Sequence, residues 1–213
     1  MFFLVVFINS SNPNKEVQQK KVSTPAKVVT EPTMPQKQGQ KKVALRSKPT
    51  EGNLTVGAVK SMLLRYNFYC EKYDWSNEYC NPNGTGIQHN YEKQSKNGVD
   101  VVVDHASGLM WQQSGSKNYT NNADAKQYVD QLNRDKFAGY SDWRLPTLEE
   151  AMSLMETTKM NDDLYIDPKF GKTQRWIWTS DSYSASSAWV VDFNDGNCNI
   201  NDFEYYGCVR AVR

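Results

Sequence analysis

The C-terminal stretch of the chain, residues 189–213, sets a polar insert inside an apolar frame, and this pattern constrains the fold more than any other feature. The frame consists of apolar residues at 189–193 and 209–212, which predict two buried strands. The insert, residues 194–208, is crowded with Asn, Asp, Gly and Tyr. These residue types favour turns, but they also suit a binding loop, because Asn and Asp form adaptable hydrogen bonds and Tyr supplies rigid contact area. We therefore expect the frame to be buried. The insert is either a polar hairpin or a recognition loop, and its Asn, Asp and Tyr side chains should mostly face solvent.

Residues 12–50 have a composition that does not support a folded core. They hold five of the eight prolines and nine basic residues against two acidic ones. Such a segment buries too little apolar surface to offset its ordering entropy, so we interpret it as a disordered linker. The whole chain has a formal net charge of +1, which makes the region after the linker mildly acidic. This balance argues against a domain that binds nucleic acid specifically.

Residues 1–11 form an apolar N-terminal remnant. The apolar run at 2–8 is too short to cross a bilayer and lacks the basic residues that precede a signal-peptide core. We favour the remnant of a longer membrane anchor; a misassigned start and a disordered end are the alternatives. An anchor would place the protein at a membrane or the cell surface. Without an anchor, the cytoplasm is the alternative location.

The cysteines and histidines do not form a metal-binding pattern. Cys70 and Cys80 are one pair ten residues apart, Cys198 and Cys208 are another, and the chain has only two histidines. Zinc sites use closer ligand spacings, so we expect no metal and no cofactor. Each cysteine pair is either a disulfide or two free thiols.

The pattern of helix and strand signals predicts an α+β domain with two central helices. Thr55 is expected to cap a helix that runs to Tyr66, and Asn121 or Asn122 to begin a second one. Thr147 with Glu150 fits a capping box, so Glu149 and Glu150 belong to a helix start rather than to a catalytic pair. Short antiparallel strands are expected at 99–104, 176–179, 188–193 and 208–212. Residues 51–96 are interpreted as an N-terminal extension packed on a domain of residues 97–213.

A series of motifs in this domain resembles one protein family. Gly-Leu-Met-Trp-Gln begins at 108, Phe-Ala-Gly-Tyr-Ser-Asp-Trp-Arg-Leu-Pro-Thr at 137, Trp-Thr-Ser at 178, Ala-Trp-Val-Val at 188 and Val-Arg-Ala-Val-Arg at 209. Together they are similar to the DUF1566 family, also called the Lcl C-terminal domain. The resemblance implies a C-type-lectin-like fold, related to formylglycine-generating enzymes, whose paired terminal strands would set residues 101–103 beside 209–212.

Two narrower resemblances bear on function. Residues 54–95 loosely resemble an extension of members attached to bacterial serine/threonine kinases, which implies a link to a kinase system. Other members are variable proteins of diversity-generating retroelements, in which adenine-directed errors rewrite Asn codons near the gene's end. Such errors never produce Glu, Lys, Gln, Met or Trp, and in 194–208 only Glu204 lies outside the reachable set. The resemblance therefore implies a variable region at 182–208.

We expect a non-enzymatic recognition protein that binds a protein or another macromolecular ligand through this region. The expected contact residues are Asp192, Asn194, Asp195, Asn197, Asn199, Asn201, Asp202, Phe203, Tyr205 and Tyr206. One alternative is the sensor domain of a kinase-linked receptor that binds a small molecule. The other is a formylglycine-generating-enzyme-like oxidoreductase with a reactive Cys198 or Cys208.

Other residues that suggest chemistry have simpler explanations. Asp104, His105 and Ser107 are interpreted as a strand-to-turn segment, because neighbours in sequence rarely form a catalytic pair. Arg144 and Arg210 are expected to form buried ion pairs, with Asp142 as a partner. The tryptophans of the domain are expected to be core residues, namely Trp143, Trp176, Trp178 and Trp189.

Overall fold

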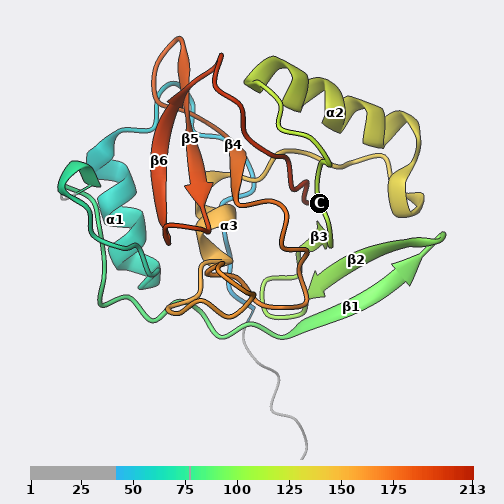
Figure 1. Ribbon diagram of the computed structural model, residues 1–213, viewed down its shortest axis with the longest axis horizontal. Coiled ribbons are helices and arrows are strands. Elements are labelled where there is room, and N and C mark those ends of the chain that lie inside the picture. The colour runs from blue at the N-terminus through green and yellow to red at the C-terminus, as the bar shows by residue number, and fades with distance from the viewer. Residues whose placement is uncertain (1–41, 77) are drawn as a thin grey trace, which may run out of the picture. The chain divides into compact units, whose positions relative to one another are not determined.

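The protein is described by a computed structural model that covers residues 42–76 and 78–213. It is an α+β fold with few helices and two small antiparallel sheets of three strands each (Figure 1). The helices are α1 (Val56–Tyr66), α2 (Asn122–Arg134) and α3 (Leu148–Ser153), and single 3₁₀ turns lie at Asp74–Ser76 and Phe137–Gly139. The strands are β1 (Tyr91–Lys96), β2 (Val99–Asp104), β3 (Met110–Gln112), β4 (Trp176–Ser182), β5 (Ser187–Asp192) and β6 (Asn197–Asp202).

All three α-helices begin at the residues that the sequence predicts. The side chains of Thr55, Asn121 and Thr147 each accept a hydrogen bond from a backbone N–H in the first turn of α1, α2 and α3. At α3 the capping box is complete, because Glu150 also accepts from the backbone of Thr147. A side-chain cap satisfies N–H groups that have no partner inside the helix, so these local signals are sufficient to fix the starts.

The first sheet corrects the expected pairing of the terminal strands. Its order is β1–β2–β3, and the C-terminal segment pairs with β3 rather than with β2. Met110 and Arg213 exchange backbone hydrogen bonds of 3.0 and 2.9 Å, and Val212 also pairs with Arg144. Residues 101–103 therefore do not lie directly beside 209–212, because the short strand β3 takes the place between them.

The second sheet, in the order β4–β5–β6, contains one strand that the sequence did not predict. β6 lies inside the polar insert, where Asn and Asp give little strand propensity. The expected strand at 208–212 forms only isolated bridges, such as the parallel one between Ile177 and Cys208. The C-terminal segment thus runs from the edge of β4 to β3 and joins the two sheets (Figure 1).

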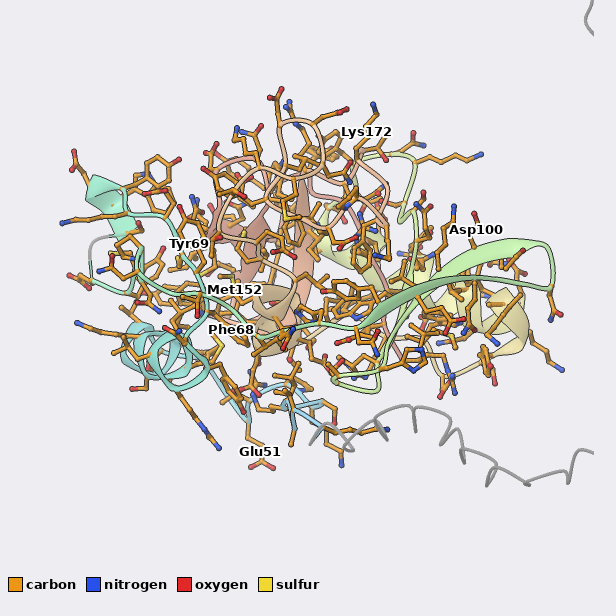
Figure 2. All side chains as sticks on the ribbon, turned by 90° about the horizontal axis from the view of Figure 1, so that it is seen from below. Glu51, Phe68, Tyr69, Asp100, Met152 and Lys172 are labelled. Atoms are coloured by element: carbon orange, nitrogen blue, oxygen red, sulfur yellow. The ribbon has the colours of Figure 1, made fainter. Side chains whose placement is uncertain are left out.

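The second sheet lies between two apolar clusters, because its side chains alternate between its faces. Ile177, Trp189 and Val191 belong to a cluster that includes residues of α1 and α3. Trp178 and Val190 point into the other cluster, against α2. Figure 2 shows Phe68 and Met152 of the first cluster among the interior side chains, with Glu51 and Lys172 at the periphery.

The frame of the C-terminal stretch is buried as predicted. Its buried residues are Trp189, Val190, Val191, Phe193, Val209, Arg210, Ala211 and Val212. The core interpretation of the tryptophans is confirmed for Trp143, Trp178 and Trp189, whereas Trp176 is half-buried.

Residues 42–50, which the sequence assigns to the linker, pack on the folded domain instead. The guanidinium of Arg46 donates to both carboxylate oxygens of buried Asp181, at 2.8 Å each, and the backbone N–H of Thr50 donates to the same group. Thr147 Oγ1 donates to the carbonyl of Arg46 at 2.7 Å. The low apolar content of residues 42–50 predicts a linker, because composition does not reveal the hydrogen bonds that attach this stretch to the domain. The expected apolar remnant and linker residues 12–41 lie outside the described residues.

No helix among the described residues has the length and apolar character that crossing a bilayer requires.

Candidate ligand-binding site

The expected contact residues divide between the two ends of the β5–β6 hairpin. The register pairs Asp192 with Asn197 beside the turn and Ser187 with Asp202 at the other end. Five residue steps along a strand span roughly 17 Å, so a small ligand at one end does not reach the other. The turn group is Asp192, Asn194, Asp195 and Asn197, and the opposite group is Asp202, Phe203, Tyr205 and Tyr206.

At the turn end, the polar side chains shape the backbone. Asp192 Oδ1 accepts hydrogen bonds from the backbone N–H groups of Asn194 and Asp195, at 2.8 and 3.1 Å. Gly196 adopts a φ of 72°, which favours glycine, and donates to the Asp192 carbonyl. Tyr73 also donates its hydroxyl to the carbonyl of Asp195. Burial raises the pKa of Asp192 above its ordinary value, although the bonds from Asp195 and Asn194 oppose the change. These groups are engaged in holding the turn.

Along β6, the expectation of solvent-facing Asn side chains is wrong for one residue. Asn197 is only 1% exposed, because it pairs with Asp192 in the sheet. Its side-chain amide has no hydrogen-bond partner among the described residues. Asn199 and Asn201 are half-buried, and Asn199 Oδ1 accepts from the backbone of Ile200. β6 therefore offers a ligand little free polar surface.

At the opposite end, the loop of residues 203–206 is held on both sides. Before it, the backbone N–H of Phe203 donates to Ser186 at 2.8 Å, and the carbonyl of Phe203 accepts from Asn122 at 3.0 Å. After it, Gly207 and Thr120 exchange backbone hydrogen bonds of 2.9 and 2.7 Å. The loop thus begins at the end of β6, next to the first turn of α2, and ends at the isolated bridge between Gly207 and Thr120.

Close packing favours glycine at position 207, where this loop ends. A Cβ atom on Gly207 would lie 3.0 Å from the indole Nε1 of Trp178, which is fully buried. The same indole N–H donates to the carbonyl of Thr120 at 2.8 Å. A side chain at position 207 would displace this contact, so the loop and the core are fitted to each other.

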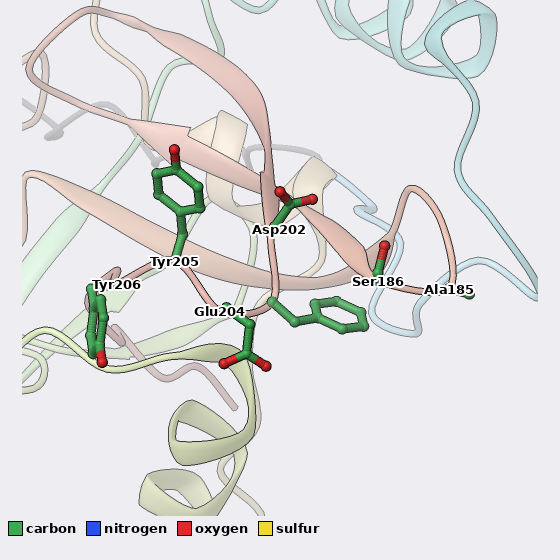
Figure 3. Close-up of a pocket in the computed structure, with 7 residues that line it drawn as sticks. Ala185, Ser186, Asp202, Glu204, Tyr205 and Tyr206 are labelled. Atoms are coloured by element: carbon green, nitrogen blue, oxygen red, sulfur yellow. The ribbon is translucent and has the colours of Figure 1, made fainter.

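The loop projects two tyrosines beside an open pocket. Tyr205 is 58% exposed and Tyr206 is 60% exposed, and both are large apolar side chains on the surface. The pocket has a volume of about 640 Å³ and combines the loop with the β4–β5 turn. Figure 3 shows the two tyrosine side chains leaving the loop in different directions. The pocket is lined by Ala185, Ser186, Asp202, Phe203, Glu204, Tyr205 and Tyr206. Four of the ten expected contact residues therefore meet at one site.

Phe203 differs from the tyrosines in being half-buried. It packs against the apolar cluster beneath α2, and the ammonium of Lys126 lies 5.6 Å from the centre of its ring. Phe203 therefore anchors the loop to the domain, while Tyr205 and Tyr206 remain available to a partner.

The cysteines form neither of the two disulfides that the sequence allows. Cys70, Cys198 and Cys208 are buried free thiols, and the thiols of Cys70 and Cys198 hydrogen-bond to each other. This contact and burial raise the pKa of Cys198 well above its ordinary value, and burial raises the pKa of Cys208. Both cysteines of the variable region thus favour the protonated, weakly nucleophilic thiol.

A buried His–Asp pair is the main polar contact that the sequence reasoning missed. His89 Nδ1 lies 2.8 Å from Asp104 Oδ2, and its Nε2 lies 2.6 Å from the carbonyl oxygen of Ser153. The hydroxyl of Ser107 donates to Asp104 at 2.6 Å and does not contact His89. His105 instead contacts exposed Glu92. Because Asp104 holds both partners, the arrangement lacks the serine–histidine contact of a nucleophile and its base. The fifteen-residue separation of His89 and Asp104 gave no signal in the sequence.

The expectation of an ion pair is confirmed for Arg144, although its partner is not Asp142, and is wrong for Arg210. Arg144 binds Glu150, and Asp142 binds Arg213. Arg210 is fully buried and donates only to uncharged oxygen atoms, those of Gln112, Gln113, Gly171 and Gln174. Burial lowers its pKa to about 10. In the part of the chain that the structure describes, no group of three or more His, Cys, Asp or Glu residues could hold a metal ion.

Comparison with known families gives one match. A model of the Lcl C-terminal domain family matches residues 100–213. The matched part begins within β2 and includes β3, the helices α2 and α3, and the whole of the second sheet. No curated protein is significantly similar to the chain.

Proposed function

The chain belongs to the Lcl C-terminal domain family, and from this premise we propose that it is a non-enzymatic recognition protein that binds a macromolecular ligand through residues 202–206. The observation that carries the proposal is the pair of exposed tyrosines, Tyr205 and Tyr206, on a loop fixed at both ends beside a pocket. Tyrosine side chains order only two torsions on binding, so they supply contact area at a small entropic cost.

The fixed loop favours binding because it is already ordered. Association loses free energy when side chains and loops become ordered at an interface. Residues 203–206 follow directly from the sheet and end at Gly207, whose hydrogen bonds with Thr120 hold the backbone. A partner therefore meets a surface whose backbone needs little rearrangement.

The chemistry of the cysteines supports recognition rather than oxidation. An enzyme of the formylglycine-generating type would need a reactive thiolate open to its substrate. Cys198 and Cys208 are buried, and the pKa of each is raised. A raised pKa leaves less thiolate at neutral pH. We therefore propose that both thiols are structural, and alkylation of the native protein should leave them unmodified.

We further propose that the scaffold is C-type-lectin-like and that a diversity-generating retroelement acts on its C-terminal region. Burial narrows the positions at which variation is tolerated, since Asn197 and Cys198 are within the core. Exposed Asp202, Tyr205 and Tyr206 accept substitution without loss of packing. The neighbouring DNA should contain a reverse-transcriptase gene and a near-copy of codons 188–213 that differs mainly at adenines. Absence of both would remove the retroelement from the proposal.

The first prediction tests the tyrosines directly. Peptides selected from a random phage-displayed library on the wild-type protein should lose binding to the double variant Tyr205→Ala/Tyr206→Ala. The free energy of unfolding should change by no more than about 0.5 kcal/mol, because both side chains are exposed. Peptide binding is measured by fluorescence anisotropy, and stability by urea denaturation.

Tyr119 provides the matched control, because it is 47% exposed but lies outside the loop. Tyr119→Ala should keep the binding of the selected peptides. A large loss of stability in the double variant would identify Tyr205 and Tyr206 as core residues. Selected peptides that bind the double variant as well as the wild type would overturn the recognition site.

A further inference from the structure

The pocket beside the tyrosine loop has a one-sided charge. Asp202 and Glu204 are exposed and line it, and none of its lining residues is basic. Within the described residues, neither carboxylate takes part in an ion pair, although eight other acidic residues do. Two carboxylates without partners at the rim of an open pocket attract a cation and repel an anion.

The aromatic side chains in the same pocket add a second preference for cations. The face of an aromatic ring carries partial negative charge, so it attracts an ammonium or guanidinium group within about 6 Å. Lys126 already occupies this relation to Phe203, at 5.6 Å. Tyr205 and Tyr206 have no such partner among the described residues, and more than half of each side chain is accessible.

We propose that the ligand of this pocket is a segment of a partner protein that brings a lysine or arginine side chain to the surface lined by the tyrosines and the two carboxylates. The proposal rests on the recognition function given above and names its ligand class. The volume of about 640 Å³ lies in the range of about 300–1,000 Å³ typical of binding pockets, so it admits a long side chain with its flanking backbone. The two carboxylates disfavour nucleic acid and anionic lipid, because both carry negative charge.

Lys126 places a positive charge next to the pocket, because its ammonium lies 5.6 Å from the centre of the ring of Phe203, which lines the pocket. Its ammonium opposes the binding of a second cation at the pocket and would favour an anion. Neutralising Lys126 and neutralising the carboxylates should therefore change the affinity for a basic ligand in opposite directions. An uncharged apolar ligand would respond weakly to both changes.

The test uses the full chain and defined probes. A fluorescent Gly/Ser peptide that carries lysines is compared by anisotropy with otherwise identical peptides that carry glutamate or glutamine. The lysine peptide should bind most tightly, and its affinity should fall as salt is raised, because exposed charges are screened. Asp202→Asn/Glu204→Gln should weaken its binding by about tenfold, and Lys126→Gln should strengthen it by about twofold.

The matched control removes the same charge elsewhere. Asp74 and Glu78 are exposed and belong to the segment that contacts the turn end of the hairpin through Tyr73. Asp74→Asn/Glu78→Gln changes the net charge equally and should leave the affinity unchanged. An effect equal to that of the pocket variant would show nonspecific attraction and overturn the proposal.

The outcomes separate this inference from the recognition function. If the library peptides depend on Tyr205 and Tyr206 but not on the carboxylates, the cation assignment is wrong and the recognition site stands. Preferred binding of the glutamate peptide would likewise overturn the cation assignment alone. If no ligand depends on the tyrosines, the recognition site itself fails.

Discussion

Arg210 shows how a single residue connects distant parts of this domain. Its guanidinium reaches carbonyls at the end of β3 and in the segment that precedes β4, and it lies 5.0 Å from the centre of the Phe170 ring. A buried charge is costly unless its hydrogen bonds are satisfied. The two terminal nitrogens of the planar group meet most of this need by donating on two sides, which a lysine ammonium cannot do, whereas Nε has no hydrogen-bond partner among the described residues. Arg210 therefore stabilises the domain by joining separate segments through hydrogen bonds. It has no carboxylate partner among the described residues.

The second prediction follows from this geometry. Arg210→Lys should reduce the free energy of unfolding by roughly 3 kcal/mol or more, because several buried carbonyls lose their donors. Arg213→Lys, three residues later, is the control: Arg213 pairs with Asp142, whose side chain is 62% exposed, and should lose less than about 1 kcal/mol. Urea denaturation measures both. Equal losses would contradict the special role of Arg210.

At the scale of the elements, the sequence predicts the helix starts, which depend on local signals, better than the strands, which depend on long-range pairing. Thr55 and Thr147 mark helix starts because a cap satisfies backbone groups only a few residues away. β6 escaped prediction because its pairing with β5, rather than its own Asn-rich sequence, makes it a strand.

In the candidate site, too, some residues could be predicted from the sequence and others could not. Exposed Tyr205 and Tyr206 were identified from composition and position. The burial of Asn197 and the structural use of Asp192 depend on hairpin register, which an irregular polar insert does not specify. The pocket could not be predicted either, because the register of the sheet decides that the β4–β5 turn lies next to the loop, although both belong to residues 182–208.

Asp104 gives the third prediction, because it joins the end of β2 to His89. Burial acts to raise its pKa, but the hydrogen bonds from His89 and Ser107 outweigh burial and hold the pKa well below its ordinary value. A depressed carboxyl pKa stabilises the folded state above the unfolded pKa of about 3.9, and this stability is lost as the pH falls below it. Asp104→Asn should therefore destabilise the protein near neutral pH and flatten the decline of stability below pH ~4.

Denaturation at a series of pH values measures both effects. Asp100→Asn is the control, since the Asp100 side chain is 44% exposed and pairs with Lys93 on the surface. It should behave as the wild type. An unchanged acid decline in Asp104→Asn would show that other carboxylates control acid unfolding.

At the scale of the whole domain, the residues before the family-matched region complete its core. The indole N–H of Trp189 donates to the carbonyl of Leu54 at 2.8 Å, and the N–H of Glu71 donates to Gly196 at 2.8 Å. Leu63 and Phe68 are fully buried in the same cluster as Ile177 and Trp189. One face of the second sheet is therefore covered in part by chain that lies outside residues 100–213, and in part by α3.

The fourth prediction is that the matched region does not fold stably by itself. A fragment of residues 100–213 would expose the part of that face that α1 and residues 54–70 cover, and should bind a hydrophobic dye and unfold without cooperativity. A fragment of residues 42–213 should unfold in one cooperative transition, because it keeps α1 and the Arg46–Asp181 contact. Calorimetry and dye fluorescence distinguish them. A cooperative transition of the shorter fragment at the same temperature would show that the extension is dispensable.

The hydrogen bonds that fix both ends of residues 203–206 limit which mutations this surface can accept during evolution. Because Ser186 and Asn122 fix one end and Thr120 fixes the other, the number of residues between them is set by the span to be bridged. An inserted or deleted residue would break one of these anchors, whereas a replaced side chain leaves them intact. The loop is therefore constrained in length, whereas its exposed side chains can be exchanged one at a time without loss of these anchors.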